Sequence, residues 1–358
     1  MKTIIIFPLS RIALAGVVSM FLLLIFHAVA RAEMTLQQIA PFGSDSQSLS
    51  NPKIVAVLPD GHWALVGYGS GAISLDAIAP PGVWYRSHEC NILQGHSKNI
   101  TGIAITPDGN KAISTSWDRT VRIWDLNTCS QLMSHTDENQ SISVAVTPDG
   151  KYAVTGHGAG TVYIWDMINN RLARTVSTYA YVPAVSVMPD SIHAITGDGF
   201  GKLIMWDITT GSRKLEFKGG DSVVRSLAIS QDGSLLAAAR EDNTLEVWDI
   251  ANNTQKNLIT TSRASSHYIT TMSFQADNNR IVTAVDGFYG TNALTVWNLD
   301  NNLSRRMYLG EVNNFQHFSM TADKKYLVVI GERRNKLNLY DVATSNIVRS
   351  VEIGKRLK

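Results

Sequence analysis

The chain contains few reactive side chains at spacings that suit catalysis or metal binding. His88, Glu89 and Cys90 are adjacent, but neighbouring residues of a strand point to opposite faces, so these three are poorly placed to bind one ion. The glycine-rich run at 156–160 ("GHGAG") precedes no helix, as a phosphate loop would, and is interpreted as a turn. The sequence also lacks a C-x-x-C-H haem motif and a G-x-S-x-G nucleophile turn. We therefore predict no catalytic residue, no cofactor and no metal site.

Seven aspartates recur along the chain in short turns related to "PDG", 41 to 48 residues apart. They are Asp60, Asp108, Asp149, Asp190, Asp232, Asp277 and Asp323. Their number suggests calcium binding, but regular spacing places each one in a separate structural unit, where the carboxylates cannot converge. In such a turn, Asp accepts a hydrogen bond from its own backbone two residues on, and Gly takes positive φ without steric cost. We interpret them as backbone-shaping residues.

A Trp-Asp pair ends 17 residues after four of these aspartates, at 124–125, 165–166, 206–207 and 248–249. Weaker copies are Trp297-Asn298 and Tyr340-Asp341. Apolar and polar residues alternate between the marks, which is typical of strands with one buried face. Each repeat therefore predicts four strands, a to d. In the second copy these are 100–105, 111–114, 121–125 and 130–133.

The repeat length and the Trp-Asp mark resemble the WD-repeat (WD40) family, over residues 51–358. This resemblance implies an all-β fold, a seven-bladed β-propeller of four-stranded antiparallel blades. Such blades bury both faces by stacking around a ring. Closure of the ring needs a fourth strand for the last blade, and we expect it from the C-terminal "NIVRSVEI" (346–353) rather than from "MTLQQIA" (34–40).

Blades of this family often contain a hydrogen-bonded set of His, Ser or Thr, Asp and Trp. The second repeat matches it with His96, Ser114, Asp118 and Trp124. Other repeats keep the tryptophan but lose the His or the Asp, so we expect most blades to be held mainly by apolar packing. The tryptophans of these repeats are Trp165, Trp206, Trp248 and Trp297.

The resemblance also implies that the b–c turns and the d–a connections share one rim of the propeller, the top rim. Turns are normally small and polar, yet these are rich in aromatic residues and Arg, the types that dominate interface hot spots. We predict a partner-binding surface from Tyr68, Trp117, His157, Tyr181, Phe200, Arg240, Tyr268, Phe288, Tyr289, Arg333 and Arg334. The alternative for each residue is that it packs over a neighbouring blade or fills the channel.

Two functions from different classes follow. The favoured one is a non-enzymatic scaffold that binds a protein or peptide at the top rim, which is what the resemblance implies. The alternative is a propeller enzyme or small-ligand or cofactor binder that acts in the central channel. Strand a contributes small and apolar residues to that channel, as in "SISVAV", which weighs against the second reading. A structural subunit of an envelope assembly is a third possibility.

The first 32 residues predict a secretory signal, with an early basic residue, Lys2, an apolar run and Ala30 and Ala32 in an A-x-A arrangement. A lead segment follows at 33–50. We expect cleavage after Ala32 and a periplasmic location. An uncleaved membrane anchor facing the periplasm and secretion are the alternatives, and contact with a membrane is expected only in the anchored form. Removing the segment changes the net charge from +2 to −1, which argues against nucleic acid as a partner.

The chain has two cysteines, Cys90 and Cys129. They occupy matching places in successive repeats. Because separate blades were expected to hold them beyond disulfide range, we predict two unpaired thiols.

Overall fold

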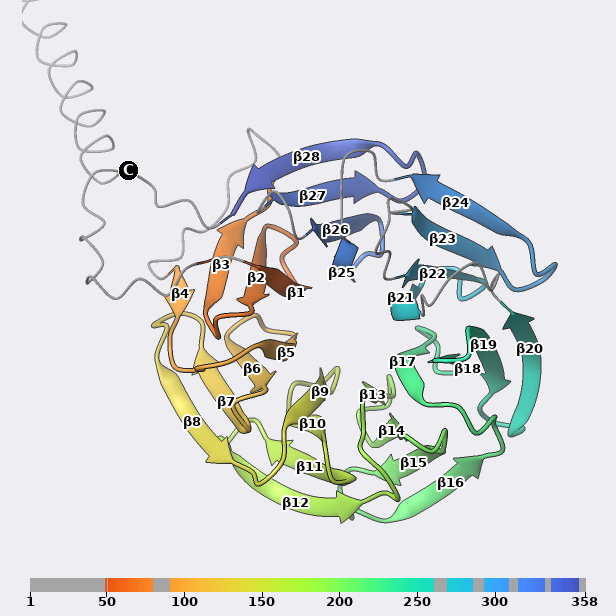
Figure 1. The fold of residues 1–358 in the computed structure, drawn as a ribbon, viewed down its shortest axis with the longest axis horizontal. Helices are drawn as coiled ribbons and strands as arrows, with labels where there is room; N and C mark the ends of the chain where they lie inside the picture. The colour runs from red at the N-terminus through yellow and green to blue at the C-terminus, as the bar shows by residue number, and fades with distance from the viewer. Residues whose placement is uncertain are drawn as a thin grey trace, which may run out of the picture. The chain divides into compact units, whose positions relative to one another are not determined.

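The computed structural model describes residues 49, 51–79, 91–260, 269–285, 293–308, 315–331 and 336–353. Within these ranges the regular elements are 28 β-strands. They form seven four-stranded sheets arranged around a ring (Figure 1). None of the described residues belongs to a helix with the length and apolar character needed to span a bilayer. The predicted signal lies outside these ranges, and so does the predicted lead segment at 33–50 apart from Leu49.

The first four blades take up the chain from 52 to 217. Blade one contains β1 (Pro52–Val57), β2 (Trp63–Tyr68), β3 (Ile73–Ala77) and β4 (Ile92–Leu93). Blade two contains β5 (Ile100–Ile105), β6 (Lys111–Ser116), β7 (Thr120–Asp125) and β8 (Gln131–Thr136). Blade three contains β9 (Ser141–Val146), β10 (Tyr152–His157), β11 (Thr161–Asp166) and β12 (Arg171–Ser177). Blade four contains β13 (Ala184–Val187), β14 (His193–Gly197), β15 (Leu203–Asp207) and β16 (Arg213–Phe217).

The last three blades take up the chain from 224 to 352. Blade five contains β17 (Val224–Ile229), β18 (Leu235–Arg240), β19 (Thr244–Asp249) and β20 (Thr254–Thr260). Blade six contains β21 (Ile269–Phe274), β22 (Arg280–Val285), β23 (Ala293–Asn298) and β24 (Ser304–Tyr308). Blade seven contains β25 (Phe315–Met320), β26 (Tyr326–Gly331), β27 (Lys336–Asp341) and β28 (Ile347–Glu352).

Each blade is an antiparallel meander whose strands follow chain order. The predicted strand-a to strand-d pattern is confirmed, and in blade two strand a has the predicted bounds while the bounds of the other three differ from the predicted ones by one to three residues at an end. Seven is also the observed number of blades. The expected fold class, a seven-bladed β-propeller, is therefore correct.

The a–b turns have the predicted chemistry. Asp108 Oδ1 accepts hydrogen bonds from the Asn110 backbone N–H (3.0 Å) and from the Thr106 hydroxyl (2.6 Å). Gly109 has φ of 71°, a conformation that glycine adopts without steric cost. The turn aspartates therefore shape the backbone, as expected.

The core consists of seven apolar clusters, each between two successive blades. Alternation along each strand puts one set of side chains against the blade before and the other set against the blade after. Leu339 of blade seven and Val66 of blade one share the cluster that closes the ring, with Ile353 after the last strand. The fourth strand of blade seven is β28, so the prediction of C-terminal closure is confirmed.

The expectation of free thiols is wrong for Cys129, which is in a disulfide. The chain has one other cysteine, Cys90, which lies outside the described residues. Cys129 packs against the apolar cluster shared by blades one and two. A place in a separate repeat therefore does not by itself leave the Cys129 thiol unpaired.

Candidate functional site

The b–c turns and the d–a connections share one rim, as predicted. Backbone hydrogen bonds join them, among them Trp117 N–H to Asn99 C=O, Gly158 N–H to Gln140 C=O, and Gly199 N–H to Tyr181 C=O. These bonds are 2.8–3.0 Å long. The top rim is therefore a ring of turns fixed to one another rather than separate loops.

Two aromatic side chains stand out from this rim. Trp117 is 46% exposed and Phe200 is 61% exposed, although large apolar side chains are normally covered. Within the described part of the chain, neither makes a ring contact or a side-chain hydrogen bond. We call Trp117, Phe200 and the half-buried Tyr181 the aromatic rim.

The turn that carries Phe200 is held rigidly from below. Asp198 is fully buried, and its Oδ1 accepts hydrogen bonds from the backbone N–H groups of Phe200 and Lys202, both at 2.9 Å. The Tyr181 ring lies so close to Gly199 that a Cβ there would sit 2.3 Å from a ring carbon. Phe200 is therefore presented in a defined position, and any larger residue at 199 would have to displace the Tyr181 ring.

Tyr179 belongs to a different environment. Its hydroxyl accepts a hydrogen bond of 2.9 Å from the Arg213 guanidinium, and that group also lies 5.5 Å from the ring centre. Arg213 is the first residue of β16, an outer strand of blade four. The Tyr179 side chain is thus engaged at the outer edge of the propeller.

Three residues of the predicted surface are buried instead. Tyr68 and His157 are 0% exposed and Arg240 is 1% exposed. Each is the last residue of a strand b, namely β2, β10 and β18, and not a residue of the following turn. A strand residue points to one face of its sheet, so these side chains lie between blades and cannot contribute to a rim surface.

Five predicted residues lie outside the described residues: Tyr268, Phe288, Tyr289, Arg333 and Arg334. Their assignment to a binding surface stays a prediction.

The hydrogen-bonded set of blade two is present as expected. His96 Nδ1 lies 2.9 Å from Asp118 Oδ2, and Nε2 lies 2.7 Å from Ser114 Oγ. Trp124 Nε1–H donates to the same hydroxyl at 2.8 Å. Burial lowers the pKa of His96, although Asp118 acts in the opposite direction. A neutral ring thus links the turn to strands b and c beneath the top rim.

Blade three builds a similar network with its residues exchanged. The histidine, His157, comes from the end of strand b, and the carboxylate, Asp137, comes from the connection before the blade. His157 Nδ1 lies 3.0 Å from Asp137 Oδ2, and Nε2 lies 2.8 Å from Thr155 Oγ1. Trp165 Nε1–H donates to Thr155 at 2.9 Å. Burial lowers the pKa of His157 to about 4, against the effect of Asp137, so the ring is neutral at pH 7.

Blade five uses an ion pair for the same purpose. Arg240 Nη2–H donates to Glu246 Oε2 at 2.8 Å, and Arg240 Nη1 donates to the carbonyls of Gly201 and Ser222. Trp248 Nε1–H donates to Glu246 Oε2 at 3.2 Å. Thus Glu246 takes the place of the hydroxyl that accepts from tryptophan in the other blades.

Hydrogen bonds of the indole groups therefore add to the apolar packing that the sequence predicts as the main stabilisation of most blades. The indole N–H groups of Trp206 and Trp297 also donate to strand-b threonines, Thr196 and Thr283, at 2.8 and 2.9 Å. These threonines occupy the same strand-b position as Ser114, six residues after the turn aspartate, so the Trp and hydroxyl members of the set remain in blades that lack its His. In the sequence, a Ser or Thr on strand b ten or fourteen residues before the tryptophan would have indicated this hydrogen bond.

Blade one has a carboxylate where five other blades have tryptophan and blade seven has tyrosine. Asp76 pairs with Ala64 of β2, as Trp124 pairs with Ala112 of β6. Ser74 Oγ donates to Asp76 Oδ2 at 2.5 Å and lies 3.1 Å from the Tyr68 hydroxyl. Burial raises the pKa of Asp76 to about 6, partly offset by the Ser74 hydrogen bond.

The described residues include no group of three or more His, Cys, Asp or Glu side chains that could hold a metal ion. Most of the polar groups described above hydrogen-bond to one another under the top rim, although Asp198 Oδ2 and Arg240 Nε have no hydrogen-bond partner among the described residues. The exposed aromatic rim is therefore the described part of the predicted surface that is open to a partner.

Comparisons with known proteins match parts of the chain. The WD40 family model, described as "WD domain, G-beta repeat", matches residues 87–125, 127–166 and 211–249. Cross-pathway control WD-repeat protein 2 of Flammulina velutipes is 51% identical over 37 residues, which is 10% of this chain and 12% of that protein.

Small ribosomal subunit protein RACK1 is also similar in short segments. The Caenorhabditis elegans protein is 38% identical over 53 residues, 15% of this chain and 16% of that protein. The Drosophila melanogaster protein is 53% identical over 34 residues, 10% of this chain and 11% of that protein. The chain thus spans less than a fifth of the length of these relatives. What the comparisons establish is that this seven-bladed propeller contains WD40 repeats in three places.

Proposed function

We propose that this protein is a non-enzymatic scaffold that binds a protein or peptide segment across the top rim of its propeller. The observation that carries the proposal is the exposure of Trp117 and Phe200 on turns whose backbones are fixed. Exposed aromatic side chains lose little conformational entropy on binding and supply large contact areas.

The surroundings of Trp117 suggest the charge of the partner. Lys98 and Arg119 are exposed on the same rim, and among the described residues neither belongs to an ion pair. A tryptophan beside uncompensated cations suits a segment with carboxylates next to an apolar or aromatic residue. The names of the similar proteins agree with a role in assemblies, since RACK1 is named as a protein of the small ribosomal subunit.

Export to the periplasm is the location that we propose with this function. Two features support it: the signal-like first 32 residues and the disulfide at Cys129. Disulfides persist in oxidising compartments and are rare in the cytosol.

Affinity capture with paired variants tests the binding role. A Trp117→Ala/Phe200→Ala variant should lose a protein that the unaltered chain retains, whereas Leu258→Ala should retain it. Leu258 is 58% exposed on the outer strand β20, so it matches the apolar loss at a different place. Retention of every protein by the double variant would refute the top-rim assignment. Thermal unfolding should be equal for all three proteins, because the altered side chains are exposed.

A further inference from the structure

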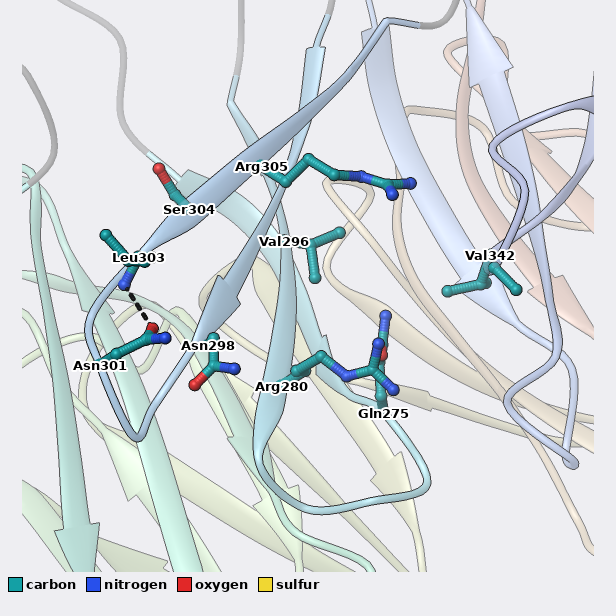
Figure 2. Close-up of a pocket in the computed structure, with 10 residues that line it drawn as sticks. Gln275, Arg280, Val296, Asn298, Asn301, Leu303, Ser304, Arg305 and Val342 are labelled. Atoms are coloured by element: carbon teal, nitrogen blue, oxygen red, sulfur yellow. Dashed lines mark hydrogen bonds between the residues drawn. The ribbon is translucent and has the colours of Figure 1, made fainter.

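A pocket opens on the opposite, bottom rim, between blades six and seven. Its volume is about 250 Å³, below the range of drug-sized ligand sites. It therefore suits a small ligand or one end of a peptide. Figure 2 shows Arg280 and Arg305 extending from blade six toward the side where Val342 of blade seven lies.

The polar lining of this pocket consists of groups that can donate hydrogen bonds. They are the guanidinium groups of Arg280 and Arg305, the amides of Gln275, Asn298 and Asn301, and the Ser304 hydroxyl. No carboxylate belongs to the lining. Such a surface favours an anion, and two guanidinium groups suit the planar shape of a carboxylate.

The charge of Arg305 is not balanced by a carboxylate among the described residues. Its Nη2–H donates to the neutral Ser345 hydroxyl. Arg280 is paired through Nε with Asp277 Oδ2 at 2.6 Å. This contact orients the guanidinium and leaves its two terminal nitrogens available to a ligand. The pocket thus has one uncompensated cation and one oriented cation.

The sixth repeat departs from the others at the positions that line this pocket. Five blades have aspartate after the Trp or Tyr of strand c, for example Asp125, whereas blade six has Asn298. Four blades have Thr or Ser before the a–b turn, for example Thr106, which binds the turn aspartate. Blade six has Gln275 there instead, and Arg280 holds the turn aspartate. Asn298 replaces a carboxylate, and Gln275 replaces a hydroxyl that elsewhere binds the turn aspartate. Each change adds a side-chain amide to the pocket.

The rest of the lining is apolar. Val296 and Val342 form walls, and Leu303, which is largely exposed, stands at the edge. A fully hydrated phosphate gains nothing from such walls, whereas a carboxylate attached to a short apolar group buries that group against them.

We propose that this pocket binds a carboxylate carried by a small apolar group. A peptide C-terminus that ends in an aliphatic residue and a free short-chain carboxylic acid share this chemistry. The site is separate from the aromatic rim, so it would let the propeller hold a second ligand on its other face.

Calorimetric titration of the purified protein tests the proposal with four probes: N-acetyl-Gly-Val with a free C-terminus, its C-terminal amide, isovalerate and inorganic phosphate. The free acid should bind at least about tenfold more tightly than the amide, because a charge-assisted hydrogen bond is lost with the amide. Isovalerate binding as tightly as the peptide acid would identify a free small acid as the ligand. A peptide acid that binds tenfold more tightly would identify a C-terminus.

Two variants complete the experiment. Asn298→Asp restores the residue that five other blades carry, so the fold tolerates it, and its charge should weaken binding of the acid at least about tenfold. Arg305→Gln should weaken it similarly, and Arg306→Gln, the adjacent residue of β24, should leave it unchanged. Equal binding of acid and amide, tighter binding of inorganic phosphate, or unchanged binding by Asn298→Asp would overturn the proposal.

Discussion

At the scale of single residues, the top rim rests on a different buried polar group in each of several blades. Blade two uses His96 with Asp118, blade three uses His157 with Asp137, and blade five uses Arg240. A shared fold therefore tolerates several ways of pairing most of the buried donors and acceptors.

The blade-five ion pair gives a direct test of this view. Glu246→Ala leaves the Arg240 guanidinium buried without its carboxylate, so the free energy of unfolding should fall by about 3–5 kcal/mol. Glu241→Ala removes a carboxylate that is paired with Arg225 at the surface and should cost less than about 1 kcal/mol. Urea denaturation measures both.

A double change sharpens the test. Replacing Arg240 by Met and Glu246 by Leu removes both charges together and should recover most of the loss, because no buried charge is left unpaired. If Glu246→Ala and Glu241→Ala lower the free energy of unfolding equally, the buried ion pair contributes no more to stability than the surface pair.

The buried residues also show where sequence reasoning fails at this scale. Tyr68, His157 and Arg240 were placed in turns, but each is one residue earlier, at the end of a strand. A shift of one residue moves a side chain to the other face of a sheet. The exchanged network of blade three could not be recognised either, because Asp137 precedes the blade and no repeat position marks it. Trp117 and Phe200 were placed correctly because they lie inside their turns.

At the scale of strands and blades, the seam between blades one and seven closes the ring. Tyr68 packs there with apolar residues of both blades, and Asp76 is hydrogen-bonded beneath it through Ser74. Burial raises the pKa of Asp76 from 3.8 to about 6. The seam therefore contains a carboxyl group that stays protonated in the folded protein at pH values above its ordinary pKa.

This carboxyl group makes the stability of the protein depend on pH. The folded state binds more protons than the unfolded state between pH 3.8 and about 6, so stability from Asp76 is present below pH 3.8 and is lost as pH rises through 6. Asp76→Asn should therefore be more stable than the unaltered protein at pH 7.5, by about 1–2 kcal/mol, with little difference at pH 4. Asp300→Asn, at an exposed turn, serves as the control. A difference that does not change between the two pH values would contradict the role of Asp76.

The last strand provides a second test of closure. Ile353 follows β28 and is 1% exposed in the cluster that joins blades seven and one. Ile353→Ala should lower the free energy of unfolding by about 2–5 kcal/mol, since it leaves a cavity. Val348→Ala, an exposed position of the same strand, should change it by less than about 0.5 kcal/mol. Denaturation midpoints that shift equally would argue against anchoring through Ile353.

Blades and turns were predictable because their signals are local. Alternation of apolar residues and the Asp-Gly turn chemistry act within a few residues, and a period near 41 to 48 residues fixes how many units exist. The pocket between blades six and seven could not be predicted in this way. It forms where Arg280 and Arg305 of blade six lie near Val342 of blade seven. The pattern within a single repeat does not predict how side chains of two blades meet.

At the scale of the whole molecule, the disulfide at Cys129 bears on where the protein folds. Cys129 packs against the apolar cluster shared by blades one and two, and its place in the repeat did not predict that it is oxidised. We expect this bond to form only in an oxidising compartment.

Alkylation of the thiols tests the proposed export. Chain produced with residues 1–32 and recovered from the cell envelope should resist alkylation until it is reduced. Chain produced in the cytosol without residues 1–32 should be alkylated directly, because cytosolic thiols stay reduced. Mass spectrometry of the denatured protein reads the number of modified cysteines. Direct alkylation of both samples would contradict export with an oxidised Cys129.

Site-specific photocrosslinking in the producing cell tests the proposal that the top rim binds a protein partner. A photoreactive amino acid is placed at 117, at 200 and, as matched exposed controls, at Leu258 on an outer strand and Ile192 on the bottom rim. We expect positions 117 and 200 to crosslink to the same protein, and we expect no crosslink to it from 192 or 258. Crosslinks to that protein only from 192 or 258, or equally from all four positions, would contradict the proposal.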